Sequence, residues 1–230
     1  MAGANGLVGV LVAAATDLPL IDGDCVGRGL PELQMNTPNL ADVPCSPAYL
    51  IDKYGSATLE VSCPTRLEKM ARTFTKSGDN NAALVFNLMQ TPLPQNAIAT
   101  KTLSRAVSLG HSLMQQKLPQ SCKVLTEGII TKIDLSIKNG FLMGTFCVQS
   151  KEEHFSILVK NEIFCVRKAD AMLTRAPTII SCLHHFEPLA SDALRVGMPI
   201  SIVTLPASHP WNTEPGRSIV QKGFGLAHFQ

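Results

Sequence analysis

The sequence predicts an α/β domain, a layered sheet with helices, over residues 1–120, followed by an all-β domain, barrel-like or sandwich-like, over residues 121–230. In the first half, apolar residues at helical spacing alternate with short strand-like runs. From about Ser121 the pattern changes to strand-like runs that follow one another without helices. Hydrophobic residues make up 45% of the chain and charged residues 17%, which indicates a folded globular protein.

The chain opens with an apolar run that predicts a buried helix over Gly6–Ala15. Because about 20 apolar residues are needed to cross a membrane and no Lys or Arg precedes the run, we expect neither a membrane span nor a signal peptide. A buried strand, Leu18–Ile21, follows. A chain that begins so close to a core helix leads us to expect a further N-terminal part.

The rest of the first domain reads as a crossover unit followed by a helix. Residues 36–47 hold three prolines and predict a loop. A strand over Ser56–Ser62, a helix from Pro64 to about Lys76 and a buried strand over Ala82–Met89 then follow in order. A second helix is expected from Thr100 or Thr102 to about Lys117.

The second domain is predicted from alternation of apolar and polar residues. The Asn139-Gly140 pair is the clearest hairpin signal in the chain, because both residues favour the backbone of a type I′ turn. The strand-like runs are Val124–Ile137, Gly140–Val148, His154–Arg167, Met172–Leu183 and Met198–Leu205.

A candidate site lies between Leu18 and Met35, where Asp22, Asp24, Arg28 and Glu32 follow the predicted strand. Carboxylates that share a site shift each other's pKa and can serve as acid and base, while an arginine can hold a carboxylate or an imide-like oxygen. Ordinary turn chemistry, with Arg28 paired to Asp24 or Glu32, explains the same residues.

Two further residues are candidates for substrate binding. Cys25 lies inside the same stretch, although nothing near it in the sequence would activate its thiol. Trp211 stands in a loop-like tail after His209-Pro210, where it would form either the wall of a ligand pocket or a hydrophobic plug against the core.

Composition narrows the classes of partner. A net charge of +2 and the lack of basic runs argue against nucleic acid, so we expect a small-molecule substrate. The seven cysteines form no C-x-x-C pair, which favours reduced thiols and a cytoplasmic protein. We leave open whether the Asp and Glu side chains bind a divalent cation, because no His or Cys at ligand spacing supports such a site.

The stretch P-L-I-D-G-D-C-V-G-R-G-L-P-E-L-Q-M, from Pro19 to Met35, closely resembles the P-x-x-D-x-D-x-x-G-R-A-F-P-E-L-Q-M signature of the S-methyl-thiohydantoin desulfurase family. Similar segments extend along nearly the whole chain. They are Gly3-Ala4-Asn5, Leu103-Ser104-Arg105-Ala106, Gly140-Phe141, Asn161-Glu162, Pro210-Trp211-Asn212-Thr213 and Gly223-Phe224-Gly225.

The resemblance implies an α/β domain followed by a β-barrel-like domain, and hydrolysis of a five-membered imide-like ring with release of its sulfur substituent. It would make Asp22 and Asp24 the groups that position or activate water. Arg28 would hold a ring oxygen or a carboxylate, and Glu32 would be a second carboxylate or a structural partner. Thr178 and Ile129 depart from the family pattern, and we expect this sequence to begin after the glycine-rich N-terminal segment of the family.

Family members often accompany hydantoinase/oxoprolinase enzymes or are fused to them. The resemblance therefore leaves two functions open: a hydrolase-like metabolic enzyme, and a non-catalytic accessory or binding subunit of such an enzyme. The expected partners are a second copy of the chain or a hydantoinase/oxoprolinase-like protein.

Overall fold

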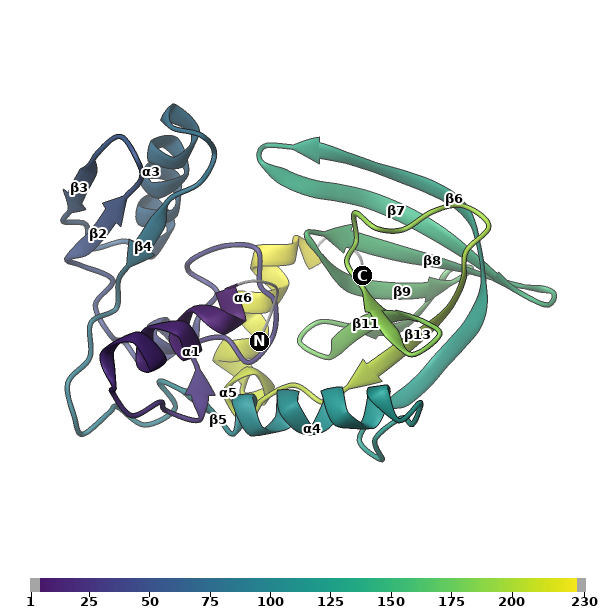
Figure 1. Ribbon diagram of the computed structural model, residues 1–230. Helices are drawn as coiled ribbons and strands as arrows, with labels where there is room; N and C mark the ends of the chain where they lie inside the picture. The colour runs from purple at the N-terminus through teal and green to yellow at the C-terminus, as the bar shows by residue number, and fades with distance from the viewer. Residues whose placement is uncertain (1–4, 227–230) are drawn as a thin grey trace.

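The computed structural model describes residues 5–226 and consists of a large curled sheet, a three-stranded sheet with one helix packed on it, a two-stranded bridge and further helices beside the curled sheet (Figure 1). Gly3 and Ala4 of the family resemblance lie outside the described residues. The helices are α1 (Asn5–Thr16), α2 (Thr37–Leu40), α3 (Pro64–Ser77), α4 (Thr102–Met114), α5 (His209–Asn212) and α6 (Glu214–Phe224). The first five strands are β1 (Gly23–Asp24), β2 (Ala48–Ile51), β3 (Ser56–Leu59), β4 (Ala83–Val85) and β5 (Ala99–Thr100).

The predicted all-β part is confirmed as an eight-stranded antiparallel sheet in the order β10-β9-β8-β7-β6-β13-β11-β12. Its strands are β6 (Lys123–Lys138), β7 (Phe141–Ser150), β8 (Glu153–Lys160), β9 (Glu162–Lys168), β10 (Ala171–Arg175), β11 (Ile179–His184), β12 (Glu187–Leu189) and β13 (Pro199–Leu205). Inward side chains from six of these strands, among them Phe146, Ile157 and Ile202, form one buried core.

The sheet curls until β9 and the segment before β11 meet, although the two strands are not neighbours in the ladder order. The backbone N–H of Ala176 donates to the carbonyl of Phe164 at 2.8 Å, which continues the β9–β10 pairing into the turn before β11. This turn brings β11 into contact with β9 at the seam. This closure gives the all-β part a barrel-like shape with a mouth facing α4 (Figure 1).

The predicted hairpin at Asn139-Gly140 is confirmed. Both residues have positive φ, 54° and 81°, as a type I′ turn requires, and Lys138 pairs with Phe141. Two of the five predicted runs are each two strands: Asn161, with φ of 55°, turns the chain between β8 and β9. Likewise, the cis bond between Ala176 and Pro177 lies in the turn between β10 and β11.

The predicted strand, helix and strand of the first part form β3, α3 and β4. Both strands pair antiparallel with β2, which lies between them, so β3 and β4 run parallel to each other. Leu67 of α3 is fully buried against Ala48 of β2, with Leu59 and Leu84 packed around them. This is a small helix-on-sheet layer, and a layered α/β domain over the whole of residues 1–120 is not established.

The predictions for the start of the chain are partly wrong. A helix forms where one was predicted, but α1 buries none of its residues. Residues Leu18–Ile21 form no strand, and Leu18, Leu20 and Ile21 are 63%, 42% and 59% exposed. The apolar character of these residues predicted that they would be buried within a sheet. In the described part of the chain, no strand pairs with them.

The C-terminal tail returns to the barrel mouth. The α5 and α6 helices carry Trp211, Val220 and Phe224 into a second buried core, where the ring of Phe224 stacks on that of Phe164 from β9 with centroids 4.9 Å apart. Met35, the end of the candidate stretch, is buried in the same core. The tail therefore fixes the candidate stretch to the barrel.

Candidate functional site

The candidate stretch is held by a two-residue bridge rather than at the end of a buried strand. Gly23 pairs with Thr100 and Asp24 with Ala99, where β1 meets β5. A Cβ atom on Gly23 would lie 3.0 Å from the carbonyl oxygen of Ala99, so the close approach requires glycine. The bridge places the loop that follows directly beside the start of α4.

Asp22 caps α4 from outside the helix. Its Oδ1 accepts hydrogen bonds from the backbone N–H groups of Leu103 and Ser104, both at 3.0 Å, and its Oδ2 accepts one from the Ser104 hydroxyl at 2.6 Å. These bonds, led by that from the Ser104 hydroxyl, lower the pKa of Asp22. The carboxylate is thus engaged in holding two segments together.

Asp24 organises the turn that carries the arginine. Its Oδ1 accepts the backbone N–H of Val26 at 2.7 Å and that of Gly27. Gly27 has φ of 66°, and a side chain there would collide with Ser208, so this position favours glycine. The result is a tight turn that delivers Arg28 to the barrel.

Arg28 closes the seam of the barrel. It is 4% exposed, and its Nη1 donates to the carbonyls of Pro177 and Thr178 at 3.1 and 2.7 Å. Its Nη2 donates to the carbonyl of Ile163 at 3.3 Å and its Nε to that of Gly29 at 3.1 Å. Burial lowers the pKa of Arg28 to about 10, with nearby Glu162 opposing the shift, so the guanidinium is charged at neutral pH.

Among residues 5–226, Glu32 and Cys25 form no bond with Arg28 and have other surroundings. The Glu32 carboxylate pairs with Lys160 of β8 and accepts a hydrogen bond from Gln34, while Lys160 also donates to the Gly223 carbonyl at 2.6 Å. Cys25 is on the surface. Desolvation and then the negative charge of Asp24 raise the pKa of the Cys25 thiol, which disfavours the nucleophilic thiolate.

Trp211 is fully buried, in the manner of a plug rather than a pocket wall. Its indole Nε1 donates to the carbonyl of Val26 at 2.5 Å, which ties the tail to the candidate loop. The structure therefore ties Asp24, Arg28 and Trp211 to one loop, while the carboxylates of Asp22 and Glu32 bond to α4 and to β8.

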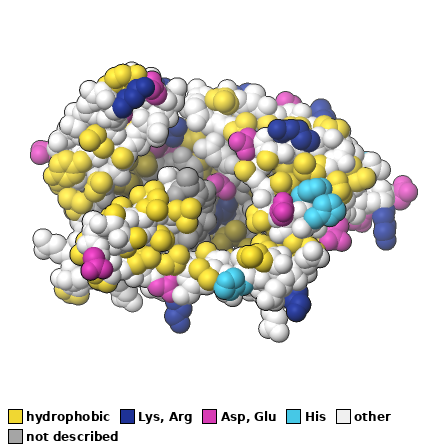
Figure 2. Space-filling model, in the orientation of Figure 1, with side chains coloured by type: hydrophobic (Ala, Val, Ile, Leu, Met, Phe, Trp, Pro, Cys, Tyr) yellow, Lys and Arg dark blue, Asp and Glu magenta, His cyan; other side chains and the backbone are white. Residues whose placement is uncertain are grey.

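A cleft of about 530 Å³ opens at the barrel mouth, within the size range of small-molecule sites. The candidate loop, the first turns of α4 and the ends of several barrel strands surround it, and Figure 2 shows the molecule hollowed at this place. The polar groups lining it come from Arg28, Thr102, Arg105, Asn161, Glu162, Ser181 and Ser191, and the apolar ones include Ile163, Ile179 and Leu189.

Glu162 is the acidic residue of this cleft, and it is not among the site residues predicted from the sequence. A Cβ atom on Gly29 would lie 2.2 Å from its Oε1, so the carboxylate rests on the bare backbone of the candidate loop. The turn at Asn161 fixes its position, because Asn161 exchanges hydrogen bonds with Leu142 at 2.7 and 2.8 Å. The one available signal was Asn161-Glu162 among the segments that resemble the family.

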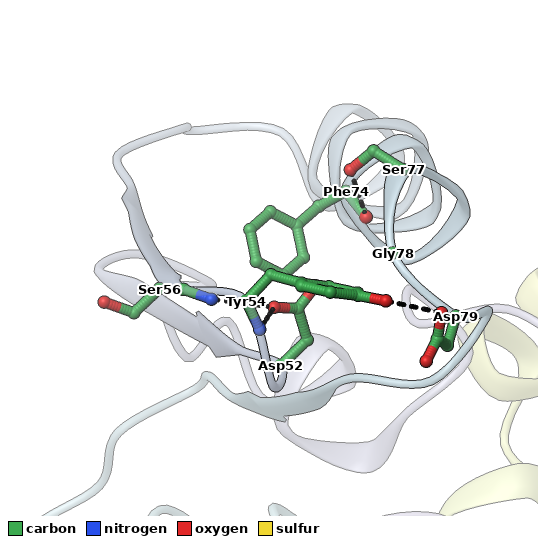
Figure 3. Close-up of a pocket in the computed structure, with 8 residues that line it drawn as sticks. Asp52, Tyr54, Ser56, Phe74, Ser77, Gly78 and Asp79 are labelled. Atoms are coloured by element: carbon green, nitrogen blue, oxygen red, sulfur yellow. Dashed lines mark hydrogen bonds between the residues drawn. The ribbon is translucent and has the colours of Figure 1, made fainter.

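A second pocket, of about 360 Å³, lies between β2, β3 and the end of α3 (Figure 3). Asp52 accepts the backbone N–H groups of Tyr54 and Gly55 at 2.8 and 2.9 Å, and the Tyr54 hydroxyl donates to Asp79 at 3.0 Å. Lys53 pairs with Asp79. The polar groups of this second pocket bond to one another at the surface, so they are less suited to bind a ligand than those of the cleft.

Metal ligands were not found in the described part of the chain. Across residues 5–226, no group of three or more His, Cys, Asp or Glu side chains is arranged to hold a metal ion. In the same residues, no helix has the length and apolar character needed to cross a membrane.

Comparison with protein families assigns the chain. The model of the S-Me-THD-like N-terminal domain matches residues 1–60, and that of the S-Me-THD-like C-terminal domain matches residues 62–230. The chain belongs to the S-Me-THD-like family. The predicted family is thus confirmed, and the candidate loop falls within the N-terminal domain while the barrel and α4 fall within the C-terminal one.

Among solved structures, the S-Me-THD-like chain is similar to the X-ray structure of a protein from Chromobacterium violaceum, with a TM-score of 0.75 and 24% sequence identity. The match covers 95% of this chain and 66% of the other, so the chain spans just under two thirds of that protein's length. At this identity the likeness supports the fold. None of the curated proteins matches the chain.

Proposed function

We propose that the barrel-mouth cleft binds a five-membered imide-like ring, S-methyl-thiohydantoin or a related hydantoin, and that the protein hydrolyses it. The observation that carries the proposal is the placement of Glu162 beside the buried Arg28 in a cleft lined by the family's own signature loop. Membership of the S-Me-THD-like family supports this substrate class.

The proposed reaction is attack by water on the ring carbon that carries the S-methyl group. Glu162 accepts a proton from the water as its oxygen bonds to that carbon. The carbon–sulfur bond then breaks, the sulfur leaves as methanethiol with a proton, and the ring carbon becomes a carbonyl. The products are hydantoin and thiol, which balance the substrate and one water molecule.

Arg28 is suited to orient the ring in this scheme. Four of its five N–H groups donate to backbone carbonyls, which fixes the guanidinium at the edge of the cleft. Its positive charge favours the developing negative charge on a ring nitrogen or oxygen. The apolar side chains of Ile163 and Leu189 would pack against the ring faces.

Within this proposal, the carboxylates of the candidate stretch mainly shape the site. Asp24 sets the turn before Arg28, and Glu32 anchors the loop after it through Lys160. A direct catalytic role for Asp22, Asp24 or Glu32 would require that carboxylate to leave the partners it has here. The prediction that Cys25 contacts the substrate is kept as part of this proposal.

The test is turnover of S-methyl-thiohydantoin by the purified chain, with hydantoin measured by chromatography so that the protein's own thiols do not interfere. We expect Glu162→Gln to lower kcat by about 100-fold or more, as loss of a general base does. Glu152→Gln, an exposed neighbour in the turn before β8, is the matched control and should leave the rate unchanged. Equal rates for the two variants would refute the role of Glu162.

Gly29→Ala gives a second test of the same geometry. The new methyl group would displace the Glu162 carboxylate from its place on the loop, so we expect kcat to fall while the fold is retained. Retained folding is checked by the urea midpoint. Full activity in this variant would show that the carboxylate need not sit against Gly29.

We also propose an alternative, a non-catalytic binding subunit of a hydantoinase/oxoprolinase-type enzyme. The observation that favours it is that the carboxylates of Asp22 and Glu32 are engaged in structural contacts. This reading expects calorimetric binding of hydantoin without turnover, together with co-purification with such an enzyme. A cytoplasmic location belongs to both proposals and is supported by seven cysteines that are all free.

A further inference from the structure

The side of α4 that lines the cleft carries a cation and a hydroxyl group. Its residues in the cleft wall are Thr102, Arg105, Ala106 and Leu109. Residues three, four and seven positions apart lie on one side of a helix, so these side chains form a continuous strip. The reaction proposed above gives this strip no role.

The charges that line the cleft do not balance. Its lining residues include two cations, Arg28 and Arg105, and one anion, Glu162. Burial lowers the pKa of Arg28 and the negative charge of Glu162 opposes this shift, so these two residues are electrostatic neighbours. Within residues 5–226, the ion pairs between side chains do not include Arg105. The cleft therefore holds one positive charge, that of Arg105, without a counter-ion from its own lining.

Arg105 also has hydrogen-bond donors to spare. Its Nη2 donates to the carbonyl of Pro206 at 3.1 Å, and its other four N–H groups make no hydrogen bond to the described residues. Arg28 differs, because four of its five N–H groups already bond to backbone carbonyls. An arginine with free donors binds a carboxylate through two parallel hydrogen bonds. Of the two arginines, Arg105 is the one equipped to take an anionic group.

The hydroxyl group of Thr102 supports the same conclusion. Thr102 is 6% exposed, and its Oγ1 is shielded from solvent and has no hydrogen-bond partner among residues 5–226. A buried hydroxyl without a partner is unfavourable, which favours a ligand group in the cleft that accepts its proton. The attraction does not come from the helix terminus, because Asp22 already accepts the N–H groups of Leu103 and Ser104.

We propose that Thr102 and Arg105 form a carboxylate subsite, and that the preferred substrate carries an acidic side chain on carbon 5 of its ring. Hydantoins and thiohydantoins made from amino acids carry the amino-acid side chain on this carbon. Those made from aspartate or glutamate end in a carboxylate. The cleft volume of about 530 Å³ leaves room for such a side chain beside the ring. This inference rests on the proposed function, which places the ring in the cleft.

The test compares two ligands that differ in charge, hydantoin-5-acetic acid and its amide, by calorimetry on the purified chain at pH 7. We expect the acid to bind about tenfold more tightly or better. Arg105→Gln should bring the ratio of the two affinities close to one, and Thr102→Val should lower it several-fold. The control, Arg195→Gln, removes an exposed arginine outside the cleft and should keep the ratio. Urea midpoints show that each variant is folded.

Equal binding of acid and amide by the unaltered chain would overturn the subsite, as would a preference that survives Arg105→Gln. Acetate and inorganic phosphate should compete at least tenfold less well than the acid. Equal competition would indicate a general anion site and would also overturn the proposal.

Turnover separates this proposal from the hydrolase. Equal kcat/KM for S-methyl-thiohydantoins with the acid and the amide side chain would retain the hydrolase and refute the subsite. A charge preference in binding without hydrolysis would retain the subsite and refute the hydrolase. Failure of both ligands to bind would refute both.

Discussion

Ser104 binds Asp22 through two of its own groups, a backbone N–H 3.0 Å from Oδ1 and a hydroxyl 2.6 Å from Oδ2. The start of α4 therefore depends on a carboxylate from a segment 82 residues earlier in the chain. Because α4 forms one wall of the cleft, this contact links the signature motif to the shape of the site.

Asp22→Asn should lower the free energy of unfolding at neutral pH and have less effect in acid. The folded-state pKa of Asp22 lies below its ordinary value of 3.8, so its stabilisation is complete above that value and is lost as the pH falls through the folded-state pKa. Urea denaturation of both proteins between pH 2 and pH 7 measures the difference. Asp17→Asn, at an exposed position nearby, is the control and should show no such dependence.

Arg28→Met should lower the free energy of unfolding by about 2–4 kcal/mol, because it leaves buried carbonyls on both sides of the barrel seam without their donor. Arg195→Met, which removes an exposed arginine that also donates to backbone carbonyls, should cost much less. Urea unfolding of both variants gives the comparison. Similar losses would mean that burial of the guanidinium contributes little.

Trp211 should report on the core and not on the cleft. As the sole tryptophan and a fully buried one, it should emit at short wavelength, resist acrylamide quenching and shift to the red on unfolding. Binding of a hydantoin should leave its emission unchanged, and a clear change would favour the pocket-wall interpretation. Trp211→Phe should cost about 2 kcal/mol through lost packing and the lost bond to Val26.

Cys63 should react first with iodoacetamide. It is exposed at the start of α3, and the backbone N–H groups of Arg66 and Thr65 lower the pKa of its thiol. Burial raises the pKa of Cys182 to about 12, so that thiol should stay unmodified in the folded protein. Mass spectrometry of timed samples at pH 7 gives the order, and Cys63→Ser should remove the fast phase. Faster labelling of Cys25, whose pKa is raised, would contradict this assignment.

Local signals in the sequence predicted the barrel well. The Asn139-Gly140 turn and the alternation along β6 to β9 are short-range features, and each strand pairs with its neighbour in the chain. Alternation misses two short turns, the single residue Asn161 between β8 and β9 and residues 176–178 between β10 and β11, because so few residues barely interrupt the pattern. The family signature likewise identified the loop of Asp24 and Arg28.

The sequence by itself determined most of the barrel strands, the longer helices, the family and the candidate loop, since these depend on neighbouring residues and on a contiguous motif. The tertiary structure decided what each side chain does. Asp22 caps a helix 80 residues away, Arg28 closes a barrel seam, and Glu162 meets Gly29 across more than 130 residues. These partners come from closure of the sheet and return of the tail, which bring together distant segments that carry no sign of each other.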